Sequence, residues 1–167
     1  MIVALDVHYT GSTAHAAAVG FDEWQSDKCI ASYTAMESPV AEYEPGKFCV
    51  RELSPLLKVI RQIDSNITTY VIDGYCHLSS DLAPGLGAYL HEALAEPTAI
   101  VGIAKNRYRQ TQHAIEVFRG KSRRPLFVTS IGIEYDVAGR CVQSMTGQFR
   151  VPEMLKAVDR LARARRS

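Results

Sequence analysis

Ile2-Val3-Ala4-Leu5-Asp6 is an apolar run that ends at a carboxylate, and Thr68-Thr69-Tyr70-Val71-Ile72-Asp73 follows the same pattern later in the chain. Both runs contain the β-branched and aromatic residues that are typical of strands. The segment between them changes to a helical period, carried by Leu53, Leu56, Leu57, Ile60 and Ile63. This spacing predicts an amphipathic helix with Pro55 in its first turn.

The remaining segments extend this pattern into a mixed sheet. Residues 14–21 are compatible with a second strand or a short helix, residues 29–36 with a third strand, and residues 37–48 with a loop. Further strands are expected at 99–104 and 125–131, and further helices at 86–94, 137–145 and 152–164. Three early strands followed by alternating helices and strands predict an α/β domain with a mixed sheet of five or more strands flanked by helices. This is the element order of the ribonuclease-H-like fold.

Length and composition describe an ordinary globular chain. The 167 residues are 47% hydrophobic and 22% charged, which excludes disorder, collagen and a coiled coil as overall descriptions. We expect one ribonuclease-H-like domain over residues 1–167. No run approaches the roughly 20 apolar residues of a membrane span, and the four cysteines form no C-x-x-C pair. We therefore expect a cytoplasmic protein with free thiols.

Charge is distributed unevenly along the chain, although the formal net charge is +1. Residues 1–104 hold 13 acidic and 5 basic side chains, whereas residues 105–167 hold 5 acidic and 14 basic ones. Clustered lysine and arginine side chains neutralise phosphates and release counterions, so this segregation indicates a polyanionic partner. The alternative is a solvated helix face with a basic tail, which we favour for the last twelve residues alone.

Acidic side chains occur where the predicted elements begin or end. Asp6 and Asp73 follow two apolar strands, and Glu52 lies at the entry to the first predicted helix. If the two strands are neighbours, the three carboxylates converge, repel one another and require a cation. Oxygen ligands favour Mg²⁺ or Mn²⁺. The alternative for each residue alone is a turn, a cap or the compensation of a helix dipole.

Five ordered blocks of the sequence resemble the endonuclease V family, nucleases that cut near deoxyinosine in DNA or near inosine in RNA. They are similar to the family's motifs D-V-x-Y, P-Y-I-P-G-x-x-x-x-R-E, V-D-G, P-T-x-G-V-A-K and Y-R-L-P-E-P. In this chain the blocks are Leu5–Tyr9, Tyr43–Glu52, Ile72–Gly74, Pro97–Lys105 and Phe149–Glu153. They follow the family's order and span residues 5–153.

The resemblance implies a ribonuclease-H-like fold and a magnesium-dependent endonuclease of DNA repair, with manganese as an alternative ion. It implies that Asp6, Glu52 and Asp73 bind the metal and carry the catalysis together with Lys105, near the scissile phosphate. Tyr43 would lie in the wedge loop, which separates the strands beside the recognised base. The basic side chains from 107 to 124 would follow the phosphate backbone. The side chains expected to contact DNA or RNA are Tyr43, Lys105, Arg107 and Arg109.

The chain departs from the family's motifs at three places. Glu42 and Glu44 replace Pro and Ile in the wedge loop, where phosphates would repel them. His77 stands two positions before the family's histidine, and it is either an accessory proton carrier or a surface histidine. The late V-S-x-G-H motif has no histidine here, so Glu134 or Asp136 is a candidate for a fourth polar group.

The sequence leaves three functions open. The first is a metal-dependent endonuclease that hydrolyses a phosphodiester in inosine-containing or structured DNA or RNA and leaves a 3′-hydroxyl. The second is a nucleic-acid-binding module of the same fold with weakened catalysis. The third is a small-molecule or protein-interaction domain with an unrelated pocket. The retained acids and Lys105 favour the first, because clustered carboxylates beside phosphates are of little use to a module that only binds.

Overall fold

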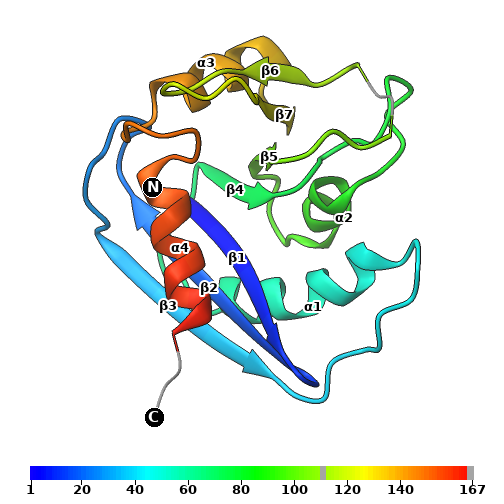
Figure 1. The fold of residues 1–167 in the computed structure, drawn as a ribbon. Helices are drawn as coiled ribbons and strands as arrows, with labels where there is room; N and C mark the ends of the chain where they lie inside the picture. Colours follow the sequence, from blue (N-terminus) through cyan, green and yellow to red (C-terminus); the bar gives the residue numbers. More distant parts are fainter. Residues whose placement is uncertain (110–111, 165–167) are drawn as a thin grey trace.

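The computed structural model describes residues 1–109 and 112–164, which form a seven-stranded mixed sheet and four helices (Figure 1). The elements in chain order are β1 (Ile2–Thr10), β2 (Thr13–Phe21), β3 (Ala31–Glu37), α1 (Phe48–Ile60), β4 (Thr69–Asp73), α2 (Leu86–Ala93), β5 (Ala99–Ala104), β6 (Ile115–Val117), β7 (Leu126–Ile131), α3 (Tyr135–Ser144) and α4 (Glu153–Arg163). The prediction of an α/β fold with a mixed sheet is confirmed. Within these described ranges, every helix is too short or too polar to cross a membrane.

The strands lie in the order β3-β2-β1-β4-β5-β7-β6. The first three form an antiparallel meander, in which β2 pairs with both β1 and β3. At the centre, β1, β4 and β5 are parallel neighbours, and β7 and β6 continue the sheet in antiparallel pairs. Because neighbouring parallel strands end at the same edge of a sheet, the residues that follow these pairings are brought together there.

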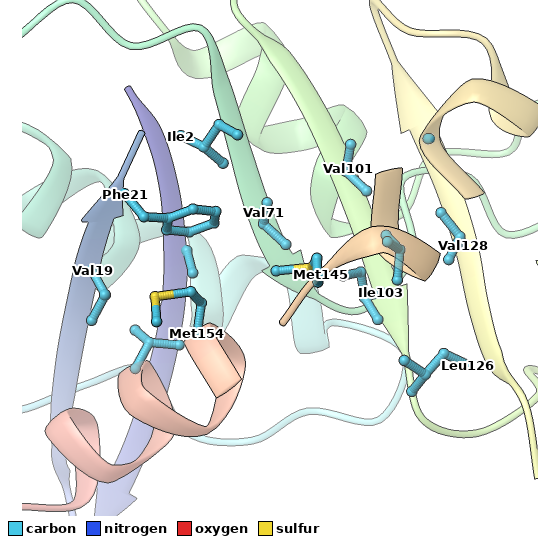
Figure 2. Close-up of a cluster of buried hydrophobic side chains, with 14 of the residues drawn as sticks. Ile2, Val19, Phe21, Val71, Val101, Ile103, Leu126, Val128, Met145 and Met154 are labelled. Atoms are coloured by element: carbon cyan, nitrogen blue, oxygen red, sulfur yellow. The ribbon is translucent and has the colours of Figure 1, made fainter. Parts of the chain in front are cut away.

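Helices cover both faces of the sheet. Alternate residues of β1 enter different cores: Val3 and Leu5 pack with α1 and α2, whereas Ile2 and Ala4 pack with α3 and α4. Figure 2 shows the second core, in which Met154 of α4 lies among the side chains of the central strands. Burial on both faces explains why the central strands are nearly continuous apolar runs in the sequence.

The structure differs from the expected elements at two boundaries. The helix predicted from residue 53 begins at Phe48, so Pro55 lies in its interior and not in its first turn. The three-residue strand β6 was not predicted, because so short a segment shows no period and is recruited by pairing with β7. Residues 14–21, for which a strand and a helix were both possible, form the strand β2.

Candidate active site

Three polar side chains lie at the carboxyl ends of the neighbouring parallel strands. The register of β1 and β4 ends with the pair Leu5 and Ile72, and Asp6 and Asp73 come directly after that pair. β5 ends at Ala104, so Lys105 is the next residue along the third parallel strand. The main-chain hydrogen bonds of the sheet therefore bring Asp6, Asp73 and Lys105 to one edge.

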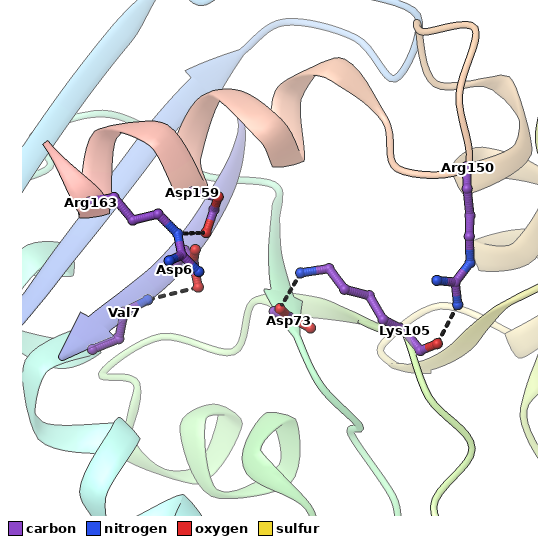
Figure 3. Close-up of polar contacts among 7 residues, drawn as sticks. All are labelled: Asp6, Val7, Asp73, Lys105, Arg150, Asp159 and Arg163. Atoms are coloured by element: carbon purple, nitrogen blue, oxygen red, sulfur yellow. Dashed lines mark hydrogen bonds and ion pairs between the residues drawn. The ribbon is translucent and has the colours of Figure 1, made fainter.

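Asp6 and Asp73 face the side of the sheet that α4 covers (Figure 3). Ala4 and Val71, two residues earlier on the same strands, belong to the core beneath α3 and α4, and the side chains of a strand alternate between faces. A narrow cleft between the strand ends and α4 has a polar lining of Asp6, Asp73, Lys105 and Asp159. We call it the acidic cleft.

Asp159 is the acidic group of this cleft that the sequence did not reveal. Its side chain hydrogen-bonds with Asp6, and Arg163 Nε donates to its Oδ1 at 2.7 Å. The sequence feature that could have identified Asp159 is the helical period of α4. Asp159 falls between Leu155 and Ala162 on the stripe of α4 that packs against the sheet, where a carboxylate is out of place unless it has a partner.

One acid of the hydrogen-bonded pair Asp6 and Asp159 keeps its proton more readily than the other. Burial raises the pKa of Asp6 to about 7, and the charges of Asp73 and Asp159 add to this effect. The Val7 backbone N–H, which donates to Asp6 Oδ1 at 2.9 Å, acts in the opposite direction. Burial also raises the pKa of Asp159, but Arg163 brings it below its ordinary value. The proton therefore resides on Asp6.

Glu52 approaches the same edge from α1, on the opposite face of the sheet. It is 8% exposed. Burial raises its pKa to about 7; hydrogen bonding with Tyr9 opposes this shift, and the charges of Asp6 and Asp73 add to it. The charges of Asp6 and Asp73 therefore act on Glu52, although Glu52 reaches this edge from the opposite face and the three carboxylates come from three separate segments.

Lys105 provides the positive charge within the acidic cleft. Its Nζ donates to Asp73 Oδ2 at 2.8 Å, and the two side chains are 42% and 41% exposed. Burial lowers the pKa of Lys105, but its interactions with Asp73, Asp6 and Asp159 raise it above the ordinary value. Lys105 is therefore held as a cation beside the carboxylates.

The chemistry of this donor set suits a hard divalent cation. The four acids offer only carboxylate oxygens, the ligands that Mg²⁺ and Mn²⁺ prefer, and they repel one another without a cation. As the side chains stand, no three acidic, histidine or cysteine residues of the described ranges are arranged to hold a metal ion. Lys105 engages one of the two oxygens of Asp73, so a cation at Asp73 competes with this ion pair for the carboxylate.

Tyr9 connects β1 to the part of α1 that carries Glu52. Pro55 has no backbone N–H, so the Arg51 carbonyl, four residues earlier, lacks its helical donor. The Tyr9 hydroxyl donates to that carbonyl at 3.2 Å. The Arg51 guanidinium lies over the Tyr9 ring, with Cζ 3.9 Å from the ring centroid. The Glu52 carboxylate is a second acceptor for the single proton of this hydroxyl, so Tyr9 contacts both the backbone of the helix and its carboxylate.

Three further candidates from the sequence are not part of the lining of the acidic cleft. His77 Nδ1 lies 2.6 Å from the Tyr135 hydroxyl, and burial lowers the pKa of the imidazole. Glu134 is an exposed residue directly before α3. Asp136 is also exposed and forms an ion pair within its own helix. The fourth acidic group at the cleft is Asp159, in place of the two candidates on α3.

The expected nucleic-acid contacts lie on exposed connections. Tyr43 is 59% exposed between β3 and α1. Arg107 and Arg109 line a cavity of about 620 Å³ in the connection that follows β5. Glu44, one of the two acids of the wedge loop, forms an ion pair with Lys47 at 2.6 Å. That ion pair reduces the repulsion between this loop and a phosphate backbone.

Arg119 is a buried exception in the basic segment. It is 4% exposed, and its guanidinium donates four hydrogen bonds of 2.8 to 3.2 Å to backbone carbonyls. The acceptors lie at and beyond the end of α3, in Val142, Gln143, Met145 and Gly147. Arg119 therefore satisfies carbonyls that a helix end leaves without donors. The prediction that all basic side chains from 107 to 124 follow a phosphate backbone is wrong at this position.

The sheet order and the carboxylates at its parallel edge define the class of protein as ribonuclease-H-like. Endonuclease V of Streptomyces avermitilis superimposes with a TM-score of 0.75 at 23% identity, over 97% of this chain and 79% of that one. Endonuclease V of Ciona intestinalis, in complex with a 24-mer DNA that contains an inosine followed by a ribo-adenosine, gives 0.79 at 17% identity, over 97% and 84% of the two chains. At these identities the likeness shows a shared fold.

The sequence establishes the family. The family model of endonuclease V matches residues 1–160, so the chain belongs to the endonuclease V family. The resemblance read from the five motif blocks is thereby confirmed. No curated protein matches the chain.

Proposed function

We propose that the protein is a magnesium-dependent endonuclease that hydrolyses a phosphodiester in inosine-containing or structured DNA or RNA and leaves a 3′-hydroxyl. Membership of the endonuclease V family supports this proposal, as does the relative from Ciona intestinalis in complex with inosine-containing DNA. The observation that carries it is the pairing of β1 and β4, which places Asp6 and Asp73 side by side at one edge of the sheet, where their charges add to the effect of burial in raising the pKa of Glu52.

Each residue of the site has a defined part in this proposal. The carboxylates of Asp6, Glu52 and Asp73 would hold the cation, and Asp159 would offer a fourth oxygen donor. When bound, Mg²⁺ supplies Lewis acidity at the phosphate. Lys105 holds a positive charge beside Asp73, where it stabilises the negative charge that develops on a phosphate oxygen during hydrolysis.

Exposed side chains beside the cleft suit a nucleic-acid substrate. Arg107 and Arg109 follow Lys105 in the chain and extend the positive surface away from the carboxylates. Tyr43 offers an exposed ring on which an unpaired base could stack, an interaction of about 1–3 kcal/mol.

A nucleic-acid-binding module with weakened catalysis is the second candidate. The ion pair between Lys105 and Asp73 favours it, because it engages an oxygen that the cation needs. Glu42 favours it as well, since its exposed carboxylate in the wedge loop has no ion-pair partner among the described residues.

A cleavage assay separates the two candidates. The substrates are labelled inosine-containing and plain DNA and RNA, incubated with Mg²⁺, Mn²⁺ or a chelator. We expect cleavage that requires a metal and is abolished by Asp73→Asn, whereas Tyr43→Ala changes only the choice of substrate. Asp64→Asn, at an exposed aspartate between α1 and β4, is the matched control and leaves cleavage unchanged. Salt-sensitive binding without cleavage under either ion would contradict the endonuclease and favour the module.

A further inference from the structure

A second cavity, of about 230 Å³, adjoins the acidic cleft. Its polar lining, which we call the arginine cavity, consists of Lys105, Asn106, Arg107, Arg123, Arg124 and Arg150. Among the described residues, no acidic side chain lines it. Lys105 belongs to both linings, so the cavity and the cleft lie next to each other, on either side of this one side chain.

Most of the positive charge in the arginine cavity is not compensated. Lys105 and Arg107 have carboxylate partners. The three other cations form no ion pair with any residue of the described ranges: Arg123, Arg124 and Arg150. Three guanidinium groups gathered without a carboxylate leave room for an external anion.

Arg150 forms a fixed wall of this cavity. Its Nη2 donates to the carbonyl oxygens of Lys105 and Pro125, the latter at 2.8 Å (Figure 3 shows the contact with Lys105). Its buried Nε has no hydrogen-bond partner among the described residues. Burial lowers the pKa of Arg150, and the charge of Arg124 lowers it further. The guanidinium groups of Arg150 and Arg124 are therefore held close together although they repel each other.

Arg124 is also oriented before any ligand arrives. Its Nη2 donates to Asn106 Oδ1 at 3.1 Å, and its backbone N–H donates to Ser122 Oγ at 3.1 Å. These contacts fix the turn that carries Arg123 and Arg124. Planar guanidinium groups bind the oxygens of a phosphate through paired N–H donors, and an oriented group loses less conformational entropy when it binds.

We propose that the arginine cavity binds a backbone phosphate of DNA or RNA next to the phosphodiester that lies in the acidic cleft. The position of that neighbouring phosphodiester rests on the proposed endonuclease function. A strand that leaves the cleft passes Lys105, the shared wall, and brings its next phosphate among Arg123, Arg124 and Arg150. The adjacency of the two cavities through Lys105 favours a phosphate within a chain over a free phosphate ion.

Binding in a chelator, where no cleavage takes place, tests this site. Fluorescence anisotropy follows the binding of plain single-stranded and duplex oligonucleotides over a range of salt concentrations. We expect Arg123→Ala/Arg124→Ala to weaken binding about 10-fold at low salt and to reduce the slope of log K against log salt by about 1, the value for one phosphate. The control Lys58→Ala/Arg61→Ala removes the same charge from exposed positions at the end of α1 and changes both quantities little. Equal effects of the two pairs would overturn the proposal.

Neutral methylphosphonate linkages, placed one at a time around the inosine of an oligonucleotide, locate the phosphate. One position is expected to weaken the binding of the wild-type protein but to add no loss in Arg123→Ala/Arg124→Ala. Inorganic phosphate is the second probe. If the variant loses affinity for inorganic phosphate but keeps its affinity for oligonucleotides, the assignment to a nucleic-acid backbone is overturned. If cleavage never occurs but the effects on binding persist, the endonuclease proposal fails and the arginine cavity stands.

Discussion

The Tyr9 hydroxyl donates a hydrogen bond of 3.2 Å to the carbonyl of Arg51, the acceptor that Pro55 leaves without a helical donor. A side chain of β1 thus completes the hydrogen bonding of α1, one residue away from Glu52. The contact joins the two segments that supply Asp6 and Glu52 to the candidate site.

The first prediction is that Tyr9→Phe lowers the free energy of unfolding by about 1 kcal/mol, because the Arg51 carbonyl loses its donor. In a Pro55→Ala background the new backbone N–H supplies the missing helical bond, so the same change costs less. Urea unfolding of the wild type, both single variants and the double variant measures the coupling, which we expect to be about 1 kcal/mol. Strictly additive effects would show that Tyr9 and Pro55 act independently.

The second prediction concerns pH. Asp6 and Glu52 have pKa values of about 7 in the folded protein and ordinary values of 3.8 and 4.5. At a pH between the ordinary and the raised values, the folded state therefore binds more protons than the unfolded state. The free energy of unfolding contributed by these groups is therefore present at low pH and is lost as pH rises toward 7. In a chelator, we expect Asp6→Asn to flatten this decline and to raise the melting temperature at about pH 8. A decline of unchanged steepness in Asp6→Asn would contradict the shift.

Third, Asp159→Asn is expected to weaken the binding of Mg²⁺ about 10-fold in isothermal titration calorimetry, because it removes a charge beside Asp6. Asp136→Asn is a closely matched control, since each aspartate pairs with an arginine four residues later on its own helix. Equal affinities of the two variants for Mg²⁺ would show that Asp159 does not contribute to the metal site.

Fourth, Arg119→Lys is expected to lower the free energy of unfolding by about 2–3 kcal/mol, because one ammonium group does not reach four carbonyl oxygens. The salt dependence of oligonucleotide binding stays as in the wild type, since Arg119 is buried. Lys121→Ala, at an exposed position, leaves stability unchanged. A reduced salt slope in a folded Arg119→Lys protein would mean that this arginine contacts phosphate after all.

Much of the fold could be predicted because its signals are local. The runs that end at Asp6 and Asp73 are apolar on both faces, and the parallel pairing of β1 and β4 places the two carboxylates side by side. The beginning of α1 was not predictable in this way. Residues 48–52 follow Pro45 and Gly46 and show no helical period. Only packing against the sheet extends the helix to them.

The parts of the site that were missed depend on the surroundings of a residue and not on its identity. By residue type alone, Asp159 is indistinguishable from a solvated acid of a helix. In the structure, the face of α4 that carries it packs against the sheet. In the sequence, Arg119 is indistinguishable from the exposed cations of its segment. In the structure it is buried against the end of α3. In both cases the decisive partner is remote in sequence: the helical period could have placed Asp159 on the packed face of α4, but not beside Asp6.

The carboxylates of Asp6 and Asp73 are spaced by the ladder of main-chain bonds between two strands, which does not depend on side-chain identity. Substitutions at neighbouring positions therefore leave this spacing in place, and the fold as a whole is shared with a protein of 23% identity. The loop that carries Tyr43 has no such support and projects into solvent. A change in this loop can therefore leave the spacing of the two carboxylates intact.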